Sequence, residues 1–157
     1  MGKKGKKIMS YVGYGIGAIL LYLAGLSIAS RFISNHGLID GRLQACSDKP
    51  NCVCSEDYPN RKYQPIEIGG RDAIATWEML KNIIINTGGD IEQEEAGYLW
   101  ATYTTPLMRF IDDVELRLDE QHKVIHIRSA SRVGSSDLGA NKQRVDNIVN
   151  KLKASAD

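Results

Sequence analysis

The hydrophobic and polar positions divide the chain into one long apolar segment and a longer region. In that region apolar residues recur at the spacings of helices and strands, as in a folded domain. From Ile8 to Ser30 no residue is charged. A helix rises about 1.5 Å per residue, so this run covers the hydrocarbon core of a bilayer, which is roughly 30 Å thick. The basic residues that flank the run are Lys3, Lys4, Lys6, Lys7 and Arg31. Because most of them precede it, the positive-inside bias predicts a single span with a cytoplasmic N-terminus.

A cleaved signal peptide is the alternative interpretation of this segment. The apolar region of a signal peptide usually covers about 7–15 residues before a site of small residues. The run here is longer, although Ser27-Ile28-Ala29 resembles a cleavage site. The length favours an uncleaved anchor and a domain outside the cytoplasm. We therefore expect a basic tip and transmembrane helix at 1–33, a tether and cysteine loop at 34–62, and the folded domain at 63–157.

Two later stretches carry apolar residues at helical spacing. In the first, between Asp72 and Asn86, the apolar stripe consists of Ala73, Ile74, Trp77, Leu80, Ile83 and Ile84. Asp72 favours a helix start and Gly88-Gly89 a helix stop. In the second, the residues that follow the i, i+3, i+4, i+7 rule are Val145, Ile148, Val149 and Leu152. Ser136 or Asp137 can cap the start of this second helix.

Alternation of apolar and polar residues predicts strands at 98–104, 113–118 and 123–129, with weaker signals at 63–68 and 91–94. The order of elements is then β-α-β-β-β-α, with the weak strand at 91–94 as an addition. We expect the α+β class, with a small antiparallel sheet and two helices packed on one of its faces.

A hairpin about Glu120-Gln121 gives the two later strands a register that suits both faces of the sheet. Its apolar pairs are Leu116 with Ile125 and Val114 with Ile127, and its charged pairs are Asp113 with Arg128 and Glu115 with His126. The charged face, which also carries Arg117, is expected to be solvated, as is common in antiparallel sheets. A binding groove on that face is the alternative.

The net charge and the spacing of two glycines indicate which classes of molecule the protein binds. The 20 Lys+Arg nearly balance the 19 Asp+Glu, which gives a net charge of +1. A nucleic-acid-binding domain usually has a basic excess, so we expect no nucleic acid. Gly13 and Gly17 form a Gly-x-x-x-Gly that favours close helix approach, and hence a homodimer or a scaffold subunit. The ordinary composition of membrane helices is the alternative explanation.

The three cysteines, Cys46, Cys52 and Cys54, lie in a turn-rich strip around Pro50-Asn51. Disulfides persist outside the cytoplasm, so we expect either a Cys46–Cys52 or a Cys46–Cys54 bridge. A zinc site needs three or four ligands at suitable spacing, and neither the cysteines nor the histidines of the sequence provide it. No metal and no cofactor are therefore expected.

The densest polar stretch runs from Arg128 to Arg144, out of a strand and through a Gly/Ser loop into a helix start. Its hydroxyls, backbone N–H groups and arginines are groups that hold a phosphate or carboxylate. The predicted ligand-binding residues are Arg128, Ser129, Ser131, Arg132, Ser136, Asp137, Asn141, Arg144, Asp112 and Asp113. The alternative is that Ser135, Ser136 and Asp137 cap the helix while the arginines pair with the two aspartates.

A non-enzymatic binding or assembly module is favoured over an enzyme. The alternative is a hydrolase that uses Asp112 and Asp113, or a serine near His126. The sequence has no Gly-x-Ser-x-Gly elbow, and side chains at 126 and 129 should lie on opposite sheet faces. The adjacent aspartates should diverge for the same reason, which weakens a shared-proton pair.

Three motifs resemble a known family. Residues 50–53 read Pro-Asn-Cys-Val, and residues 110–119 read Phe-Ile-Asp-Asp-Val-Glu-Leu-Arg-Leu-Asp. Residues 124–141 read Val-Ile-His-Ile-Arg-Ser-Ala-Ser-Arg-Val-Gly-Ser-Ser-Asp-Leu-Gly-Ala-Asn. From about Gly41 to its C-terminus the chain thus resembles the family called domain of unknown function 1499 (DUF1499).

The resemblance implies a bacterial-envelope or plastid group without a settled activity. The expected location is the bacterial inner membrane, with the domain periplasmic or otherwise extracytoplasmic. Besides the membrane, the expected partner is an anionic small molecule, a lipid headgroup or an envelope protein.

One residue departs from the pattern of that family. Where the pattern tends to continue Asn-Cys-Val-Ser-Ser, this chain has Cys54 followed by Ser55. The resemblance therefore implies that Cys46 and Cys52 form the disulfide, with Cys54 outside the pair. It also places the ten predicted binding residues in the family motif, either to bind a ligand or to hold the fold together.

Overall fold

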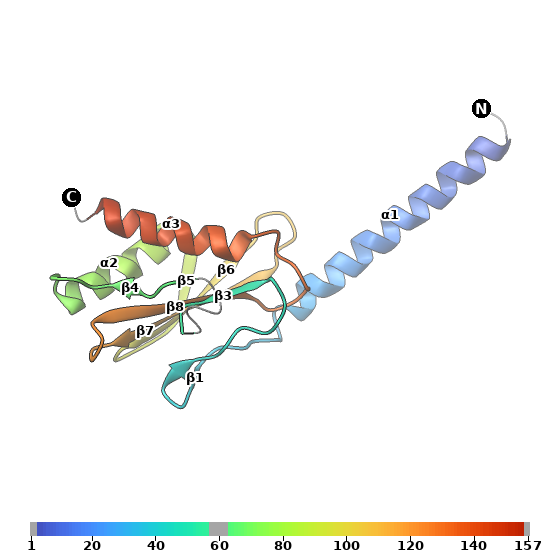
Figure 1. Cartoon of the computed structure of the whole chain (residues 1–157). Coiled ribbons are helices and arrows are strands. Elements are labelled where there is room, and N and C mark those ends of the chain that lie inside the picture. Colours follow the sequence, from blue (N-terminus) through green and yellow to red (C-terminus); the bar gives the residue numbers. More distant parts are fainter. Residues whose placement is uncertain (1–2, 57–62, 156–157) are drawn as a thin grey trace.

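A long N-terminal helix, α1 (Lys3–Ala29), projects from an α+β domain in the computed structural model of the chain (Figure 1). The structure describes residues 3–56 and 63–155, so residues 57–62 of the expected tether lie outside the described residues. From Lys7 to Ala29 the helix is long and apolar enough to cross a membrane, and no residue of this part is fully buried. Its length and composition fit a membrane anchor or a signal sequence.

The domain is built on a six-stranded antiparallel sheet with the order β3-β8-β7-β6-β5, and β4 also pairs with β8. Its strands are β3 (Cys52–Cys54), β4 (Ile66–Glu67), β5 (Gly89–Glu95), β6 (Tyr98–Thr104), β7 (Ile111–Asp119) and β8 (Val124–Ser131). A separate hairpin joins β1 (Leu38–Ile39) to β2 (Arg42–Leu43). The predicted α+β class and the order of elements from β4 onward are confirmed.

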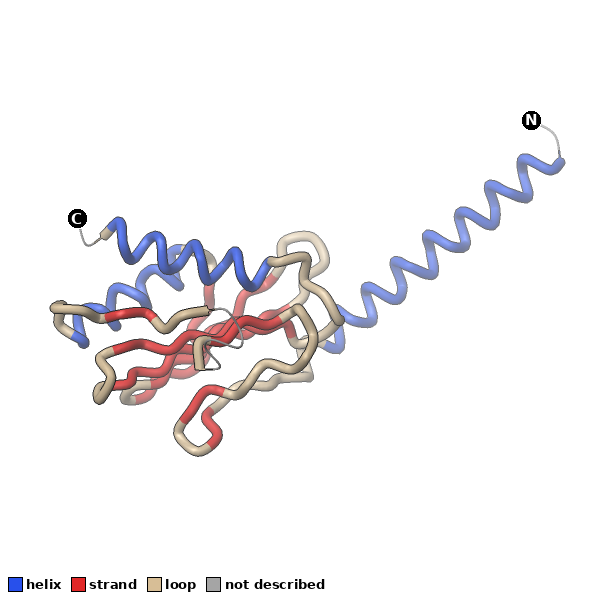
Figure 2. Tube along the Cα trace, in the orientation of Figure 1, coloured by secondary structure: helices blue, strands red, loops and turns tan. Residues whose placement is uncertain are grey.

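Two helices, α2 (Ala73–Asn86) and α3 (Ala140–Ala154), lie together on one face of the sheet (Figure 2). Asp72 caps α2, since its carboxylate accepts the N–H of Ala75 at 2.7 Å. The core residues from the two helices are Trp77, Leu80, Ile83, Ile84, Val145, Ile148 and Leu152, as predicted. Ile74 was wrongly included in the stripe and is 74 % exposed, because Thr76 and Ile83 extend the buried side of α2 in the other direction.

The predicted register of the β7–β8 hairpin is wrong. Leu116 faces Ile127 instead of Ile125, and Glu115 faces Arg128 instead of His126. The turn lies one residue later than expected, at 120–123 instead of 119–122, because β7 continues to Asp119, whose carboxylate accepts the N–H of His122 at 3.0 Å. A displacement by two residues leaves each side chain on its predicted face of the sheet.

The charged face of the sheet is buried, which contradicts the prediction of a solvated face. Asp113 is 2 % exposed, Glu115 0 % and Arg128 3 %. The chain between α1 and β3 runs over this face, and Figure 1 shows β1 on the opposite side of the sheet from α2 and α3. Leu43, on β2, is buried there against the Cys46–Cys52 disulfide. The structure thus has the cysteine pairing that the family resemblance implied.

Candidate functional site beside the N-terminal helix

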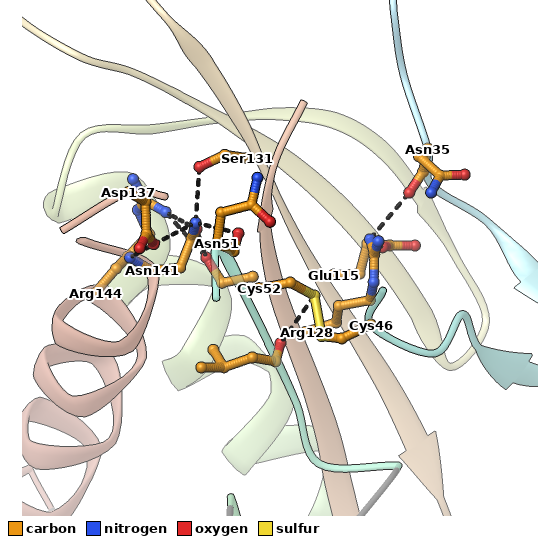
Figure 3. The surroundings of a disulfide bond; sticks show 12 residues. Asn35, Cys46, Asn51, Cys52, Glu115, Arg128, Ser131, Asp137, Asn141 and Arg144 are labelled. Carbon is orange, nitrogen blue, oxygen red and sulfur yellow. Dashed lines mark hydrogen bonds and ion pairs between the residues drawn. A yellow bond between two sulfur atoms is a disulfide. The ribbon is translucent and has the colours of Figure 1, made fainter. Parts of the chain in front are cut away.

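A buried ion pair holds the segment after α1 onto the sheet. Arg128 Nη1 lies 2.6 Å from Glu115 Oε2 and also donates to the carbonyl oxygen of Asn35 at 2.9 Å (Figure 3). The other carboxylate oxygen of Glu115 accepts the N–H of Gly37 at 2.8 Å and the hydroxyl of Tyr98 at 2.9 Å. Burial, together with the Glu115 charge, raises the pKa of Tyr98, so its hydroxyl stays protonated as a donor.

A second ion pair fixes the end of α1. Arg132 binds Asp113 through Nε and Nη2 at 2.7–3.1 Å, and Trp100 Nε1 donates to the same carboxylate at 2.8 Å. Arg132 Nη1 donates to the carbonyl oxygen of Ser30 at 3.1 Å, just after α1 ends. The Ser30 hydroxyl accepts the N–H of Ile111 at 3.2 Å. The helix therefore joins the sheet without a slack linker.

A third ion pair lies on the helix side of the sheet. Arg144 Nη2 is 2.7 Å from Asp112 Oδ2, while its Nη1 donates to the oxygens of Asn141 and Ser129. Asn141 is fully buried. Its Nδ2 donates to Ser131 Oγ at 2.9 Å, and also to Asp137 and to the carbonyl of Asn51 (Figure 3). This network connects β8 to the start of α3.

The predicted binding residues thus divide between the two faces of the sheet. On the helix side lie Asp112, Ser129, Ser131, Asp137, Asn141 and Arg144, and under the segment after α1 lie Asp113, Arg128 and Arg132. The tenth residue, Ser136, is exposed in the loop between β8 and α3. Asp112 and Asp113 bind different arginines, so they diverge as expected. The alternative that arginines pair with these aspartates holds for Arg144 and Arg132, whereas Arg128 pairs with Glu115, which lay outside the predicted set. Ligand binding by these residues stays a prediction.

His126 contacts a serine that the sequence did not indicate. Its Nδ1 lies 3.2 Å from Ser55 Oγ, and that oxygen also accepts the N–H of Ile127 at 2.9 Å. Ser55 is 2 % exposed, so its hydroxyl is not accessible to a substrate. Burial lowers the pKa of His126, although the nearby Glu56 carboxylate opposes that shift. This contact is therefore a structural hydrogen bond.

Glu56 joins His126 to a cluster of charged side chains. Its carboxylate is 2.5 Å from Arg117 Nε and 3.0 Å from Arg42 Nε. Burial raises the pKa of Glu56, but the hydrogen bonds from the two arginines outweigh burial and lower it overall. The cluster ties the segment before β4 to the end of β7.

A groove of about 400 Å³ lies at the end of the domain that meets α1. We call it the end groove. Its apolar walls come from α1, from the β6–β7 loop and from the β8–α3 loop, and include Leu23, Leu26, Leu107, Met108, Phe110, Val133 and Leu138. Its polar lining includes Asp112, Ser131, Ser136 and Asp137, all of which belong to the predicted binding set. The sequence indicated these polar residues, but it did not indicate that apolar residues of α1 and of the two loops line a groove with them.

Both carboxylates that line the end groove have partners within the domain. Asp112 is paired with Arg144, and Asp137 accepts the backbone N–H groups of Gly139 and Asn141. Ser131 Oγ accepts from Asn141, and within the described part of the chain no acceptor takes the Ser131 proton. Ligand pockets in proteins are mostly apolar with a few placed polar groups, and the end groove has this composition.

Comparison with known proteins gives a family but no activity. A family model described as a protein of unknown function (DUF1499) matches residues 42–152. The resemblance seen in the sequence motifs is therefore confirmed. The matched span begins in β2 and ends in α3, so it contains the domain walls of the end groove but not the wall from α1. No curated protein matches the chain.

Proposed function

The chain belongs to the DUF1499 family of proteins of unknown function, and from its structure we propose that it is a membrane-anchored, non-enzymatic module that binds an acyl chain of a membrane lipid. The end groove carries the proposal, because part of its wall is the apolar helix itself. Leu23 and Leu26 are half-buried against the groove, whereas most other side chains described on α1 are exposed. A lipid beside the helix therefore reaches the groove without crossing water.

The proposed location is the bacterial inner membrane, with the N-terminus in the cytoplasm and the domain in the periplasm. The lysines before the apolar run support this orientation through the positive-inside bias. The Cys46–Cys52 disulfide supports it independently, since disulfides persist in oxidising compartments.

The pairing of the arginines favours an uncharged polar group on the ligand over an anion. A phosphate bound at Arg144 or Arg132 would compete with Asp112 or Asp113, which already bind these guanidinium groups at 2.7 Å. The Ser131 hydroxyl, in contrast, suits an ester carbonyl, which is a neutral acceptor. The anionic ligand that the sequence suggested is therefore replaced in this proposal by the acyl ester of a lipid.

Native mass spectrometry of the full chain, extracted gently from its own membrane, tests the proposal. We expect an added mass that fragments as a membrane lipid. Ala140 lines the end groove at the start of α3, so Ala140→Phe fills the groove and should remove the added mass. Ala154→Phe, at the exposed far end of the same helix, is the matched control and should retain it.

Two outcomes would overturn the proposal. One is a bare polypeptide mass for the unaltered chain. The other is an added mass that survives Ala140→Phe undiminished, which would place any bound lipid elsewhere on the protein.

A further inference from the structure

Two leucines at the rim of the end groove are the most exposed large apolar side chains in the described part of the molecule. Leu138 is 98 % exposed and Leu107 is 87 % exposed. Single exposed leucines are ordinary on protein surfaces. These two, however, lie on different loops that border the same groove, beside Leu23 and Leu26 of α1. We call Leu107 and Leu138 the tip leucines.

The backbone around each tip leucine is held by hydrogen bonds. Leu138 has a φ of 54°, in the left-handed region that favours glycine, and its N–H donates to Ser136 Oγ. The loop that carries Leu107 is closed by bonds from Thr105 N to the Phe110 carbonyl at 2.9 Å and from Arg109 N to the Thr105 carbonyl at 3.1 Å. A strained backbone conformation is kept where packing or function requires it. The side chain of Leu138 is exposed to solvent, so packing within the domain does not account for its strain.

The depth of the tip leucines follows from their neighbours on α1. Leu23 and Leu26 belong to the uncharged run that ends at Ser30, and they share the end groove with both tip leucines. Figure 1 shows the β6–β7 and β8–α3 loops at the end of the domain next to α1. When the run lies in the hydrocarbon core, these loops therefore lie at the boundary between acyl chains and headgroups.

Charge at the same end fits an anionic membrane surface. Arg31 lies in the turn that follows α1, and Arg109 lies two positions after Leu107 in its loop; both are exposed. Basic residues close to a bilayer are attracted to anionic headgroups. Phe32, which is 83 % exposed, adds a large apolar side chain next to Arg31.

We propose that the tip leucines insert into the outer surface of the bilayer that holds α1, so that the domain docks on the lipid through Leu107 and Leu138. The partner is the lipid bilayer itself. This docking surface requires α1 to be in the membrane, but it does not require a lipid inside the end groove.

Depth-dependent quenching on the full chain tests this docking. The variants Leu107→Cys and Leu138→Cys carry an environment-sensitive fluorophore and are reconstituted into phosphatidylethanolamine–phosphatidylglycerol vesicles with nitroxide on the acyl chains. Ile74→Cys is the matched control, since Ile74 is also a large exposed residue but lies on α2, away from α1 (Figure 1). The unaltered chain, whose Cys54 is fully buried, gives the labelling background. We expect blue-shifted emission and at least twofold quenching at 107 and 138, and neither at 74.

Each other result rejects the proposal. Aqueous emission at 107 and 138, equal to that at 74, would show that the tips stay in water. Protection from an aqueous quencher without quenching by the lipid nitroxide would show that a protein covers them. Quenching at 107 and 138 reports on this docking, whereas the added mass in native mass spectrometry reports on the lipid in the groove, so the two proposals can fail separately.

Discussion

Glu115 and Arg128 are charged residues placed where water does not reach. The pair has 0 % and 3 % exposed side chains, and the carboxylate receives three hydrogen bonds from Arg128, Gly37 and Tyr98. Desolvation of two charges is expensive, and the attraction between them offsets it only when both keep their partners. Removal of either partner therefore leaves the other charge buried and uncompensated.

We expect Glu115→Ala and Arg128→Ala each to lower the free energy of unfolding by about 3–5 kcal/mol. Urea unfolding of the detergent-solubilised full chain, followed by tryptophan fluorescence, measures the change. Lys142→Ala is the control, because the Lys142–Asp146 pair is exposed (63 % and 42 %) and such pairs contribute about 1 kcal/mol or less. A loss in the two buried variants no larger than that in the control would contradict this interpretation.

The importance of single residues was easier to predict than their partners. The residues selected from the sequence that are now found in ion pairs are Asp112, Asp113, Arg128, Arg132 and Arg144. The partner of Arg128 was wrong because it depends on the hairpin turn. A polar turn at 119–122 and one at 120–123 both fit the alternation pattern, and only the later one brings Glu115 opposite Arg128.

The junction between α2 and β5 is tightly packed. Gly88, with a φ of 92°, turns the chain after α2, and Gly89 then begins β5 against the end of the helix. A Cβ at Gly89 would lie 2.6 Å from Ile84 Cγ2 and 2.9 Å from the ring of Tyr103. Tyr103 is itself held, since its hydroxyl donates to the Ile84 carbonyl at 3.2 Å. Neither neighbour can move away freely.

We expect Gly89→Ala to destabilise the domain by about 1–3 kcal/mol, the usual effect of overpacking a core. Thermal unfolding monitored by circular dichroism should show this as a melting temperature lower by several degrees. Gly70→Ala is the matched control, because a Cβ there meets no atom within 4 Å. Equal melting temperatures for the two variants would argue against the close contact at Gly89.

Elements with a regular period were predictable, and elements defined only by their partners were not. The 98–104 strand and the start of α2 after Asp72 were predicted at their observed positions, because alternation and capping are local signals. Strand β3 has three residues and no period of its own. It exists because it pairs with β8, and that pairing is not visible in a turn-rich sequence around three cysteines.

At the scale of the whole molecule, α1 and the domain are one connected body. Ser30, immediately after α1, is fully buried, its carbonyl accepts from Arg132, and its hydroxyl accepts from Ile111. The sequence could not predict this junction, because it depends on contacts between residues up to 102 positions apart. For the same reason the charged sheet face was expected to be open: nothing in the polar stretch after α1 indicates that it returns over the sheet.

We expect the mature protein to retain α1. The apolar run is longer than that of a signal peptide, and the bond after Ala29 lies at a junction that the folded domain holds in place. Intact-mass measurement of the protein from the membrane fraction should give a chain that includes the lysine block. A mass that corresponds to a chain starting at Ser30 would instead identify a secreted domain.

The rigid junction also decides how the domain meets other molecules. A domain on a slack linker sweeps a hemisphere, and the radius of that hemisphere grows with the linker. With α1 in a bilayer, this domain has almost no such reach, and its position relative to the lipid surface stays constant. It therefore searches in two dimensions, by lateral diffusion. It meets components of the same membrane whenever they diffuse past it. Solutes of the compartment meet it only after they have diffused to the membrane surface.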